Sequence, residues 1–257
     1  MALNNYFQDK RVWITGASSG IGKAVALELA KRGAKVAISA RNHVSLKGVA
    51  HEMGVHNVLV LPMDVTDKAQ NQAVVKRIEE CWGGLDIAFF NAGTAEYVDI
   101  KNFESGVFER TIMTNYLSMV YGIEAVLPLL RSSTPAQLGG MSSAVSFAGL
   151  PRAEAYGASK AAVRNMLQGL RIHLVQENID VFTVCPGFVR TPLTDKNDFP
   201  MPMRIEVQEA AKIIVDGIAK KKPEINFPKA FSWTYKILSN LPSRLYTRLM
   251  LSTVRQS

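Results

Sequence analysis

Residues 11–41 read RVWITGASSGIGKAVALELAKRGAKVAISAR, and this stretch decides the fold. The apolar run Arg11–Thr15 predicts a buried strand, and a turn rich in glycine and serine follows it directly. Apolar residues at helical spacing over Gly22–Arg32 predict a helix that ends at a glycine. A second apolar run, Lys35–Ser39, then predicts a parallel strand. This order of strand, turn, helix and strand is typical of doubly wound α/β sheets.

The same alternation continues along the chain. Short apolar runs predict further strands at Val58–Pro62, Leu85–Phe90, Leu138–Ser142 and Asp180–Val184, with a weaker candidate at Ile225–Phe227. Amphipathic stretches predict helices at Asp67–Trp82 (with Thr66 as N-cap), Met113–Leu130, Tyr156–Glu177 and Val207–Lys220. We therefore expect a doubly wound (Rossmann) α/β sheet of about seven mostly parallel strands with helices on both faces. Residues 1–228 form a single domain in this prediction, and residues 229–257 form a basic amphipathic extension.

The composition is that of an ordinary globular protein, with 47% apolar and 20% charged residues among 257. The formal net charge of +8 is unevenly distributed. Residues 1–219 carry 22 basic and 21 acidic side chains, whereas residues 220–257 carry 8 basic side chains and one acidic side chain. A nearly neutral body argues against a nucleic-acid-binding protein.

Cysteine and histidine spacing predicts no metal site. Cys81 and Cys185 form no C-x-x-C motif, so we expect two reduced, mostly buried thiols, which suit a reducing compartment. The four histidines have no ligand spacing either. The N-terminus carries no apolar signal segment, and no run of about 18 apolar residues occurs, so we expect a cytoplasmic protein.

The turn TGASSGIG, residues 15–22, is the first candidate binding site. Doubly wound sheets bind ligands beyond the carboxyl ends of their strands, where the strand order reverses. Free N–H groups at the start of the following helix can hold a pyrophosphate there. A plain turn is the alternative, but its place after the first strand favours the phosphate. The predicted contacts are Gly16, Ser18, Ser19, Gly20, Ile21 and Gly22.

The end of the second strand indicates which dinucleotide binds. NAD-binding units place an acid there for the ribose hydroxyls, but this chain has Ala40 followed by Arg41. A guanidinium can hold a 2′-phosphate through charge-assisted hydrogen bonds. We therefore predict NADP(H) in preference to NAD(H), with a solvated surface arginine as the alternative interpretation of Arg41.

Two further strand ends carry candidate nucleotide contacts. Asp64 can accept a hydrogen bond from an adenine amino group while Val65 packs on the ring; alternatively, Asp64 only opens the next helix. Asn91, Ala92 and Gly93 follow the next strand, where small residues let a nucleotide lie against the backbone.

Tyr156 and Lys160 form the candidate catalytic pair, because an i, i+4 spacing on a predicted helix places them on one face. An ammonium about 4 Å from the phenol contributes on the order of 4 kcal/mol at an effective dielectric near 20. We therefore expect the pKa of Tyr156 to fall by up to roughly 3 units, which makes it a usable proton donor or acceptor. Ser143, at the end of the fifth strand, is expected to hydrogen-bond the substrate oxygen, or simply to cap the strand. Asn115 lies inside a predicted helix, where we expect either a local bend with a water held near Lys160 or a packing role.

The segment after the sixth strand carries the last predicted contacts. A turn at Pro186 and Gly187 brings backbone to the site, where the Val189 N–H and the Thr191 hydroxyl can hold a nicotinamide carboxamide; a simple turn is the alternative. Residues 190–206 form a candidate substrate loop, either a mobile lid or an ordinary flexible loop. Its apolar side chains suggest an apolar ketone as substrate.

Taken together, TGASSGIG, NAG, Asn115, Ser143, YGASK and PGFVRT resemble, in family order, the short-chain dehydrogenase/reductase family in its compact single-domain form. The resemblance covers roughly residues 8–220. It implies a seven-stranded parallel sheet, a homodimer or homotetramer, and a catalytic tetrad of Asn115, Ser143, Tyr156 and Lys160. Phe90 departs from the family's NNAG pattern, which weakens one structural hydrogen bond. Ser19 stands where many NADP-preferring relatives carry a second basic residue.

The tail after Lys222 interleaves aromatic and aliphatic residues with basic ones. Such a pattern is typical of helices that lie on an anionic membrane surface. We predict peripheral membrane contact through residues 229–257, while contact between subunits and a cap over the active site remain alternatives.

The resulting functional prediction is an NADP(H)-dependent carbonyl reductase or alcohol dehydrogenase acting on an apolar small-molecule carbonyl or secondary alcohol, such as a long-chain or cyclic ketone. An NAD-dependent dehydrogenase of the same fold is one alternative. A non-catalytic dinucleotide-binding regulator is another, and the intact catalytic tetrad argues against it.

Overall fold

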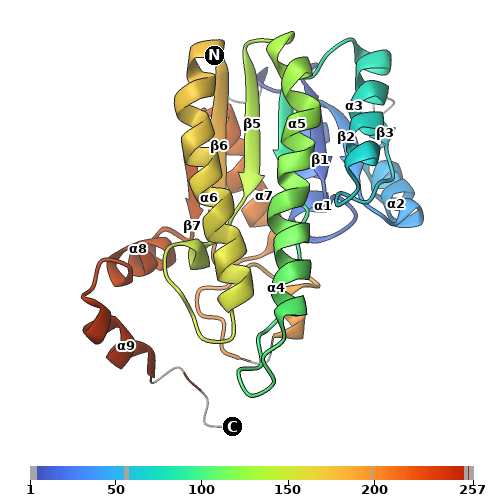
Figure 1. The fold of residues 1–257 in the computed structure, drawn as a ribbon. Coiled ribbons are helices and arrows are strands. Elements are labelled where there is room, and N and C mark those ends of the chain that lie inside the picture. The colour runs from blue at the N-terminus through green and yellow to red at the C-terminus, as the bar shows by residue number, and fades with distance from the viewer. Residues whose placement is uncertain (1–4, 55–57, 198, 252–253, 255–257) are drawn as a thin grey trace.

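The computed structural model describes residues 5–54, 58–197, 199–251 and 254. Within them, a single parallel sheet has the strand order β3-β2-β1-β4-β5-β6-β7 (Figure 1). The order reverses between β1 and β4, as a doubly wound sheet requires. The predicted fold class is confirmed. The strands are β1 (Arg11–Thr15), β2 (Lys35–Ser39), β3 (Val58–Val60), β4 (Ile87–Phe90), β5 (Ala136–Met141), β6 (Ile179–Pro186) and β7 (Glu224–Phe227).

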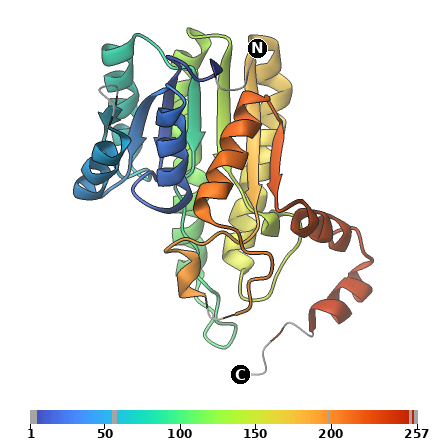
Figure 2. The same cartoon turned by 180° about the vertical axis from the view of Figure 1, so that it is seen from behind.

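Helices cover both faces of the sheet. One layer consists of α1 (Gly20–Lys31), α2 (His43–Met53) and α7 (Val207–Ala219), and it faces the viewer in Figure 2. The other layer consists of α3 (Lys68–Trp82), α5 (Ser118–Arg131) and α6 (Glu154–Leu174), and it faces the viewer in Figure 1. α4 (Ser105–Ile112) precedes α5, and α8 (Lys229–Leu238) and α9 (Ser243–Leu251) follow β7.

The continuous apolar strands are explained by two buried cores. In β1, Val12 and Ile14 point into the core under α1 and α7, whereas Trp13 between them points into the core under α3 and α5. Successive side chains of a strand point to opposite faces, so a strand covered on both faces needs apolar residues throughout. The burial of β1 therefore follows directly from its sequence.

Several predicted boundaries differ from the observed ones. Strand ends differ by up to two residues, and α2 was not predicted at all. The N-cap of α3 is Asp67, whose carboxylate accepts from the Gln70 N–H, and not Thr66. The predicted helix Met113–Leu130 is not a single α-helix. α4 continues into a π-helical segment, η2 (Met113–Leu117), and α5 begins after it. Among the cysteines, Cys185 is buried as expected, but Cys81 is exposed.

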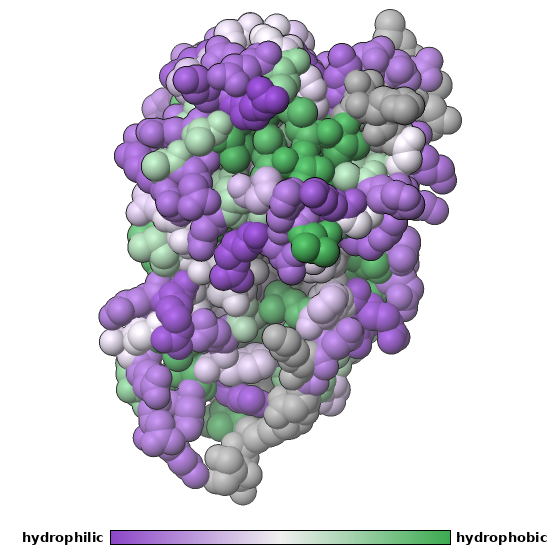
Figure 3. All heavy atoms as spheres, turned by 90° about the vertical axis from the view of Figure 1, so that its right-hand side faces the viewer, coloured by the Kyte–Doolittle hydropathy of each residue, from purple (hydrophilic) through white to green (hydrophobic). Residues whose placement is uncertain are grey.

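The sheet ends at β3, a short edge strand whose three residues are all partly exposed. Figure 3 shows the side of the molecule on which β3 and α2 lie, where apolar side chains gather between hydrophilic ones. A short edge limits the unpaired backbone available to another chain.

The C-terminal tail forms two short helices that stand out from the body near the carboxyl ends of the strands (Figures 1 and 2). α8 is attached through Phe231, whose ring lies 5.2 Å from that of Phe188 in the segment after β6. Within α8, the Phe231 ring also lies 4.8 Å from that of Tyr235. In α9 the Tyr246 hydroxyl donates to the Gly149 carbonyl. None of the described helices is long and apolar enough to cross a bilayer.

Candidate active site

A cavity of about 770 Å³ lies at the carboxyl ends of the strands, around the point where the strand order reverses. The segments that follow β1, β2, β3, β4, β5 and β6 all contribute to its wall. The predicted site residues that line it are Gly16, Ser18, Ser19, Gly20, Ile21, Arg41, Asp64, Val65, Asn91, Ala92, Gly93, Ser143, Tyr156, Lys160, Pro186, Gly187, Val189 and Thr191. Gly22 and Asn115 do not appear in this wall.

The glycine turn requires glycine at two positions for steric reasons. Gly16 has a φ of +68°, and a Cβ there would come 2.7 Å from the Cα of Ala92. A Cβ on Gly22 would come 2.3 Å from the Gly16 carbonyl oxygen and 2.4 Å from Nδ2 of Asn91. Gly22 therefore lies under the turn and lets it close, instead of facing the cavity as we predicted from the sequence.

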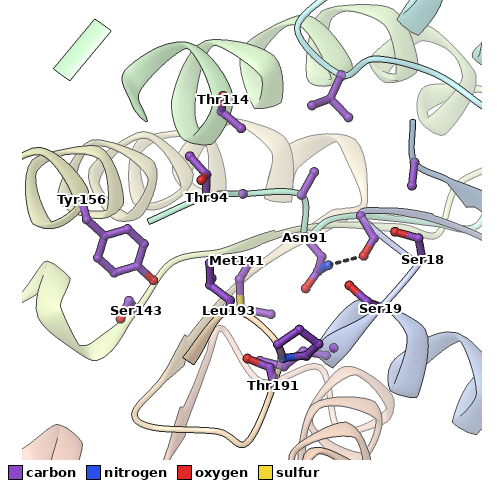
Figure 4. Close-up of a pocket in the computed structure, with 18 of the residues that line it drawn as sticks. Ser18, Ser19, Asn91, Thr94, Thr114, Met141, Ser143, Tyr156, Thr191 and Leu193 are labelled. Atoms are coloured by element: carbon purple, nitrogen blue, oxygen red, sulfur yellow. Dashed lines mark hydrogen bonds between the residues drawn. The ribbon is translucent and has the colours of Figure 1, made fainter. Parts of the chain in front are cut away.

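Asn91 and Thr15 tie the ends of β4 and β1 together. Asn91 Nδ2 donates to the carbonyls of Thr15 and Gly16 at 3.1 and 3.2 Å, and the Thr15 hydroxyl accepts from the N–H groups of Asn91 and Ala92 at 3.1 and 3.2 Å. Figure 4 shows Asn91 between the turn that carries Ser18 and Ser19 and the rest of the cavity. These bonds fix the turn next to β4. These contacts of Thr15 were not predicted from the sequence.

The start of α1 is suited to an anionic group. Its N-cap, Ser19, makes no side-chain capping bond, and the first turn contains no acidic residue. N–H groups at the helix start therefore remain free to bind an anion, and the helix dipole favours negative charge there. Ser18, Ser19, Gly20 and Ile21 all line the cavity. This set of donors fits the pyrophosphate predicted from the sequence.

Arg41 lies on the rim of the same cavity, next to Asp64. No hydrogen bond or ion pair joins its guanidinium to another residue that the structure describes, and the side chain is exposed. The Asp64 carboxylate accepts from the N–H and the hydroxyl of Thr66 at 2.9 and 2.7 Å. These bonds, and to a lesser extent the positive charge of Arg41, lower the pKa of Asp64. Asp64 thus opens the segment before α3, as one interpretation predicted, and it also lines the cavity. Its contact with an adenine amino group stays a prediction.

Tyr156 and Ser143 face each other across the far end of the cavity. In Figure 4 the Tyr156 ring projects from α6 with its hydroxyl toward Ser143. Ser143 follows β5 and is the N-cap of the short helix η3 (Ala144–Ser146). Its hydroxyl lies 3.5 Å from the carbonyl of Pro186, so it also contacts the segment after β6. A substrate oxygen placed between the two hydroxyls can be bound by both.

Lys160 is buried one helical turn from Tyr156, with 2% of its surface exposed. Its Nζ donates to the Met141 carbonyl at 2.9 Å and lies 5.7 Å from the centroid of the Tyr156 ring. Burial disfavours the charged ammonium and lowers the pKa of Lys160 to about 8. The prediction that the two side chains meet on one face of α6 is confirmed.

The predicted direction of the Tyr156 pKa is wrong for the polypeptide alone. Burial raises this pKa, and the hydrogen bond with Ser143, which lowers it, is the weaker effect. From the sequence alone, we assumed that the ammonium is fully charged and the phenol is solvated. In the structure both groups are desolvated, which favours their neutral forms.

Asn115 is fully buried within η2 and organises the region beneath Lys160. Its Oδ1 accepts from the Thr94 N–H at 2.7 Å, and its Nδ2 donates to the Thr94 carbonyl and the Ser159 hydroxyl, both at 2.9 Å. A Cβ on Gly93 would come 3.0 Å from Asn115 Oδ1 and 3.3 Å from Lys160 Nζ, so the three groups meet there. A π-helical segment surrounds Asn115, where we predicted a local bend. The water held near Lys160 stays a prediction.

The comparison with known proteins decides the family. The family model described as short chain dehydrogenase matches residues 10–200 of the chain. The chain is a short-chain dehydrogenase/reductase. It is 32% identical over 235 residues to an uncharacterized oxidoreductase of Myxococcus xanthus, covering 91% of this chain and 93% of the relative. An uncharacterized oxidoreductase of Staphylococcus aureus is 31% identical over 214 residues, covering 83% and 93%.

Solved structures support the fold of this short-chain dehydrogenase/reductase. A family member from Burkholderia phymatum in complex with NAD has a TM-score of 0.83 at 21% identity, covering 90% of this chain and 93% of that one. A short chain dehydrogenase from Burkholderia cenocepacia in complex with NADP also has a TM-score of 0.83, at 22% identity, covering 95% and 98%. Neighbours with this fold thus bind either dinucleotide.

The departure at Phe90 has a structural explanation. Phe90 is buried and packs edge-on against Trp13, with ring centroids 5.4 Å apart. A Cβ on Gly122 would come 2.2 Å from this ring, so the small residue of α5 makes room for it. Apolar packing therefore takes the place of a polar side chain at this position of the family's NNAG pattern.

The predicted substrate loop of this dehydrogenase/reductase makes contacts that were not predicted from the sequence. Tyr97, from the segment after β4, donates its hydroxyl to Asn197 of the loop 190–206. Its ring also packs edge-on against Phe199, with centroids 5.9 Å apart. Thr191 and Thr194 bond each other, with hydroxyl oxygens 3.2 Å apart, and the Thr194 hydroxyl donates to the Val189 carbonyl at 2.6 Å. No described residue beyond Thr194 lines the cavity.

Metal chemistry has no ready site in the residues described. No cluster of three or more histidine, cysteine, aspartate or glutamate side chains occurs among them.

Proposed function

We propose that this short-chain dehydrogenase/reductase transfers a hydride between NADP(H) and an apolar carbonyl or secondary alcohol. The observation that carries the proposal is the convergence of Tyr156, Ser143 and Lys160 on the cavity whose other end is the glycine turn. A dinucleotide with its phosphates on that turn spans the cavity toward Tyr156.

In reduction, the Tyr156 hydroxyl donates a proton to the substrate oxygen while the Ser143 hydroxyl hydrogen-bonds the same atom. When bound, the nicotinamide supplies the hydride in this direction and accepts it in oxidation. Because burial raises its pKa, the phenol is protonated at neutral pH and ready to donate. In oxidation the same groups take the proton from the alcohol.

Lys160 supports the proton transfer. The Met141 carbonyl holds its amino group near Tyr156, so the ammonium stabilises negative charge that develops on the phenolic oxygen. Asn115 keeps Thr94 and Ser159 in place around it. A proton relay from Tyr156 through Lys160 to a water held near Asn115 completes the proposal.

The preference for NADP(H) over NAD(H) rests on Arg41. Its guanidinium is exposed on the cavity rim, and Ala40 before it brings no carboxylate. A 2′-phosphate meets a positive charge there, whereas a ribose 2′-hydroxyl finds no acidic acceptor at Ala40. NAD dependence remains the second candidate, because a neighbour of this fold was solved in complex with NAD.

The substrate, assembly and location complete the proposed function. The loop 190–206, which Tyr97 contacts at Asn197 and Phe199, carries apolar side chains that support an apolar carbonyl or alcohol. We infer a homodimer or homotetramer, in keeping with the family. The two unpaired thiols support a reducing compartment, the cytoplasm. Residues 229–257 contact a membrane peripherally in this proposal.

The test is an NADPH-oxidation screen across ketones and aldehydes, with Tyr156→Phe as the matched variant. We expect turnover on at least one apolar carbonyl and a loss on the order of 10²–10⁴ in kcat for the variant, the size of a general-acid contribution. Full turnover in the variant overturns the mechanism. Binding of NADPH without reduction of any substrate favours the non-catalytic regulator.

A further inference from the structure

The tail helices α8 and α9 expose large apolar side chains that the core does not use. In α8, Phe231 faces the body with 6% of its surface exposed, whereas Trp233 and Ile237 are 64% and 62% exposed. Trp233 and Ile237 are four residues apart and so share one helix face. In α9, Tyr246 bonds the body, whereas Leu245 is 46% exposed. Each helix therefore has an inner face that attaches it and an outer face that remains in solvent.

Positive charge surrounds the two outer faces. Lys229 precedes Trp233 by one helical turn, and Arg244 and Arg248 lie one turn apart on α9. All three are exposed, and none forms an ion pair with a described residue. Lys236, in contrast, forms an ion pair with Glu224, with its Nζ 3.0 Å from Oε2 of the carboxylate. No acidic residue follows Glu224 in the sequence. We call Lys229, Trp233, Ile237, Arg244, Leu245 and Arg248 the outer tail surface.

We propose that the outer tail surface binds a negatively charged lipid bilayer, with Trp233, Ile237 and Leu245 entering the interface and the basic side chains binding lipid phosphates. The inference rests on the membrane contact proposed above and names the side chains and the lipid charge. Helices that lie in the interface combine a strong apolar face with flanking basic residues and aromatics. Trp in particular favours the headgroup level.

Charge favours an anionic bilayer over a second copy of the chain as the partner of the outer tail surface. Two such surfaces of the same sign repel each other, whereas anionic headgroups attract Lys229, Arg244 and Arg248 together. The position of the tail also agrees with this role. Figures 1 and 2 show α8 and α9 at the end of the molecule where the strands have their carboxyl ends, which is the end that holds the cavity. A bilayer bound there lies close to the site that takes an apolar substrate.

The test measures binding of the full-length protein to vesicles, without any substrate. Co-sedimentation compares vesicles of phosphatidylcholine alone with vesicles that also contain phosphatidylglycerol. We expect binding to the anionic vesicles only, with a blue shift in tryptophan emission. Trp13 is fully buried and Trp82 is partly buried, whereas Trp233 is 64% exposed, so Trp233 is the best placed of the three tryptophans to report insertion. One basic residue near an anionic surface raises the membrane partition coefficient about fivefold. The double variant Arg244→Gln with Arg248→Gln should therefore bind the anionic vesicles at least tenfold more weakly.

Matched variants separate the two contributions. Ile237→Ser with Leu245→Ser is expected to reduce binding and abolish the emission shift. Val44→Ser with Lys47→Gln, an exposed apolar–basic pair on α2, is expected to bind like the unchanged protein. Equal binding to neutral and anionic vesicles, or no binding, overturns the proposal. The proposal is also overturned if the protein is an oligomer, the tail variants dissociate it, and vesicle binding stays unchanged. NADPH-dependent reduction of a water-soluble ketone is measured separately, so a loss of turnover does not affect the result.

Discussion

Replacing Lys160 by methionine is expected to stabilise the folded protein at neutral pH while abolishing its proposed chemistry. Lys160 is 2% exposed, and burial lowers its pKa from the ordinary 10.5 to about 8. At neutral pH the ammonium is therefore charged in a desolvated place, which opposes folding. Methionine has a similar length and no charge, and it adapts to irregular packing.

The magnitude follows from the pKa. A pKa of about 8 in place of 10.5 corresponds to about 3 kcal/mol at 1.36 kcal/mol per pH unit. Loss of the hydrogen bond to the Met141 carbonyl costs about 1 kcal/mol. We therefore expect the free energy of unfolding of Lys160→Met to exceed that of the unchanged protein by about 2 kcal/mol at pH 7.

The sign of the pH dependence is fixed by linkage. Between pH 8 and 10.5 the unfolded chain still binds the Lys160 proton while the folded chain has released it, so the unchanged protein gains stability as pH rises through this window. The advantage of the variant should fall to about zero near pH 10. Urea denaturation at pH 7 and pH 10, without added nucleotide, measures both values. Lys47→Met, at an exposed lysine, is the control and should change stability by less than about 0.5 kcal/mol. A variant that is less stable at pH 7, or a difference that does not change with pH, refutes the reasoning.

Three further predictions concern the nucleotide and substrate sides of the cavity. Arg41→Ala should raise KM for NADPH by about 10- to 100-fold and leave KM for NADH nearly unchanged, since a hydrogen bond to a charged group contributes about 1.5–3 kcal/mol; an equal change for both nucleotides contradicts the 2′-phosphate contact. Gly16→Ala should destabilise more than Gly54→Ala and weaken the NADPH-induced rise in Tm, because both have positive φ but only Gly16 meets backbone, at 2.7 Å; equal losses contradict this steric account. Tyr97→Phe should raise KM for an apolar ketone more than it lowers kcat, because the bond to Asn197 of the loop is lost; unchanged steady-state constants show that this bond does not support the site.

Sequence patterns predicted best where one physical demand dominates. The apolar run of β1 and the glycine at 16 leave few alternatives, since a strand covered on both faces must be apolar and a Cβ at Gly16 comes 2.7 Å from the Ala92 backbone. The i, i+4 pair Tyr156 and Lys160 depends only on helix geometry, and the structure places both in the cavity wall.

Prediction failed where local signals are weak or where several elements act together. α2 has an N-cap at Asn42 and a left-handed Gly54 at its end, and these caps were the signal that was missed. Gly22 was assigned to the ligand because it belongs to the glycine pattern, but its role appears only once Asn91 of β4 is packed against the turn. The tie between Tyr97 and Asn197 joins segments 100 residues apart, which no local spacing can indicate.

The Tyr156–Lys160 pair shows why burial must be known before an electrostatic argument is made. From spacing alone, the ammonium is expected to lower the pKa of the phenol. In the folded chain, desolvation raises the pKa of Tyr156 and lowers that of Lys160 to about 8, so burial shifts both groups toward their neutral forms while Lys160 stays mostly protonated at neutral pH. A proton donor in reduction needs a protonated phenol, which burial supplies. The ammonium then matters chiefly when the proton leaves, because only then does negative charge appear near it. The buried lysine thus lowers the stability of the folded protein, but it stabilises the phenolate that forms during proton transfer. Its removal should therefore raise the free energy of unfolding and also stop the reaction.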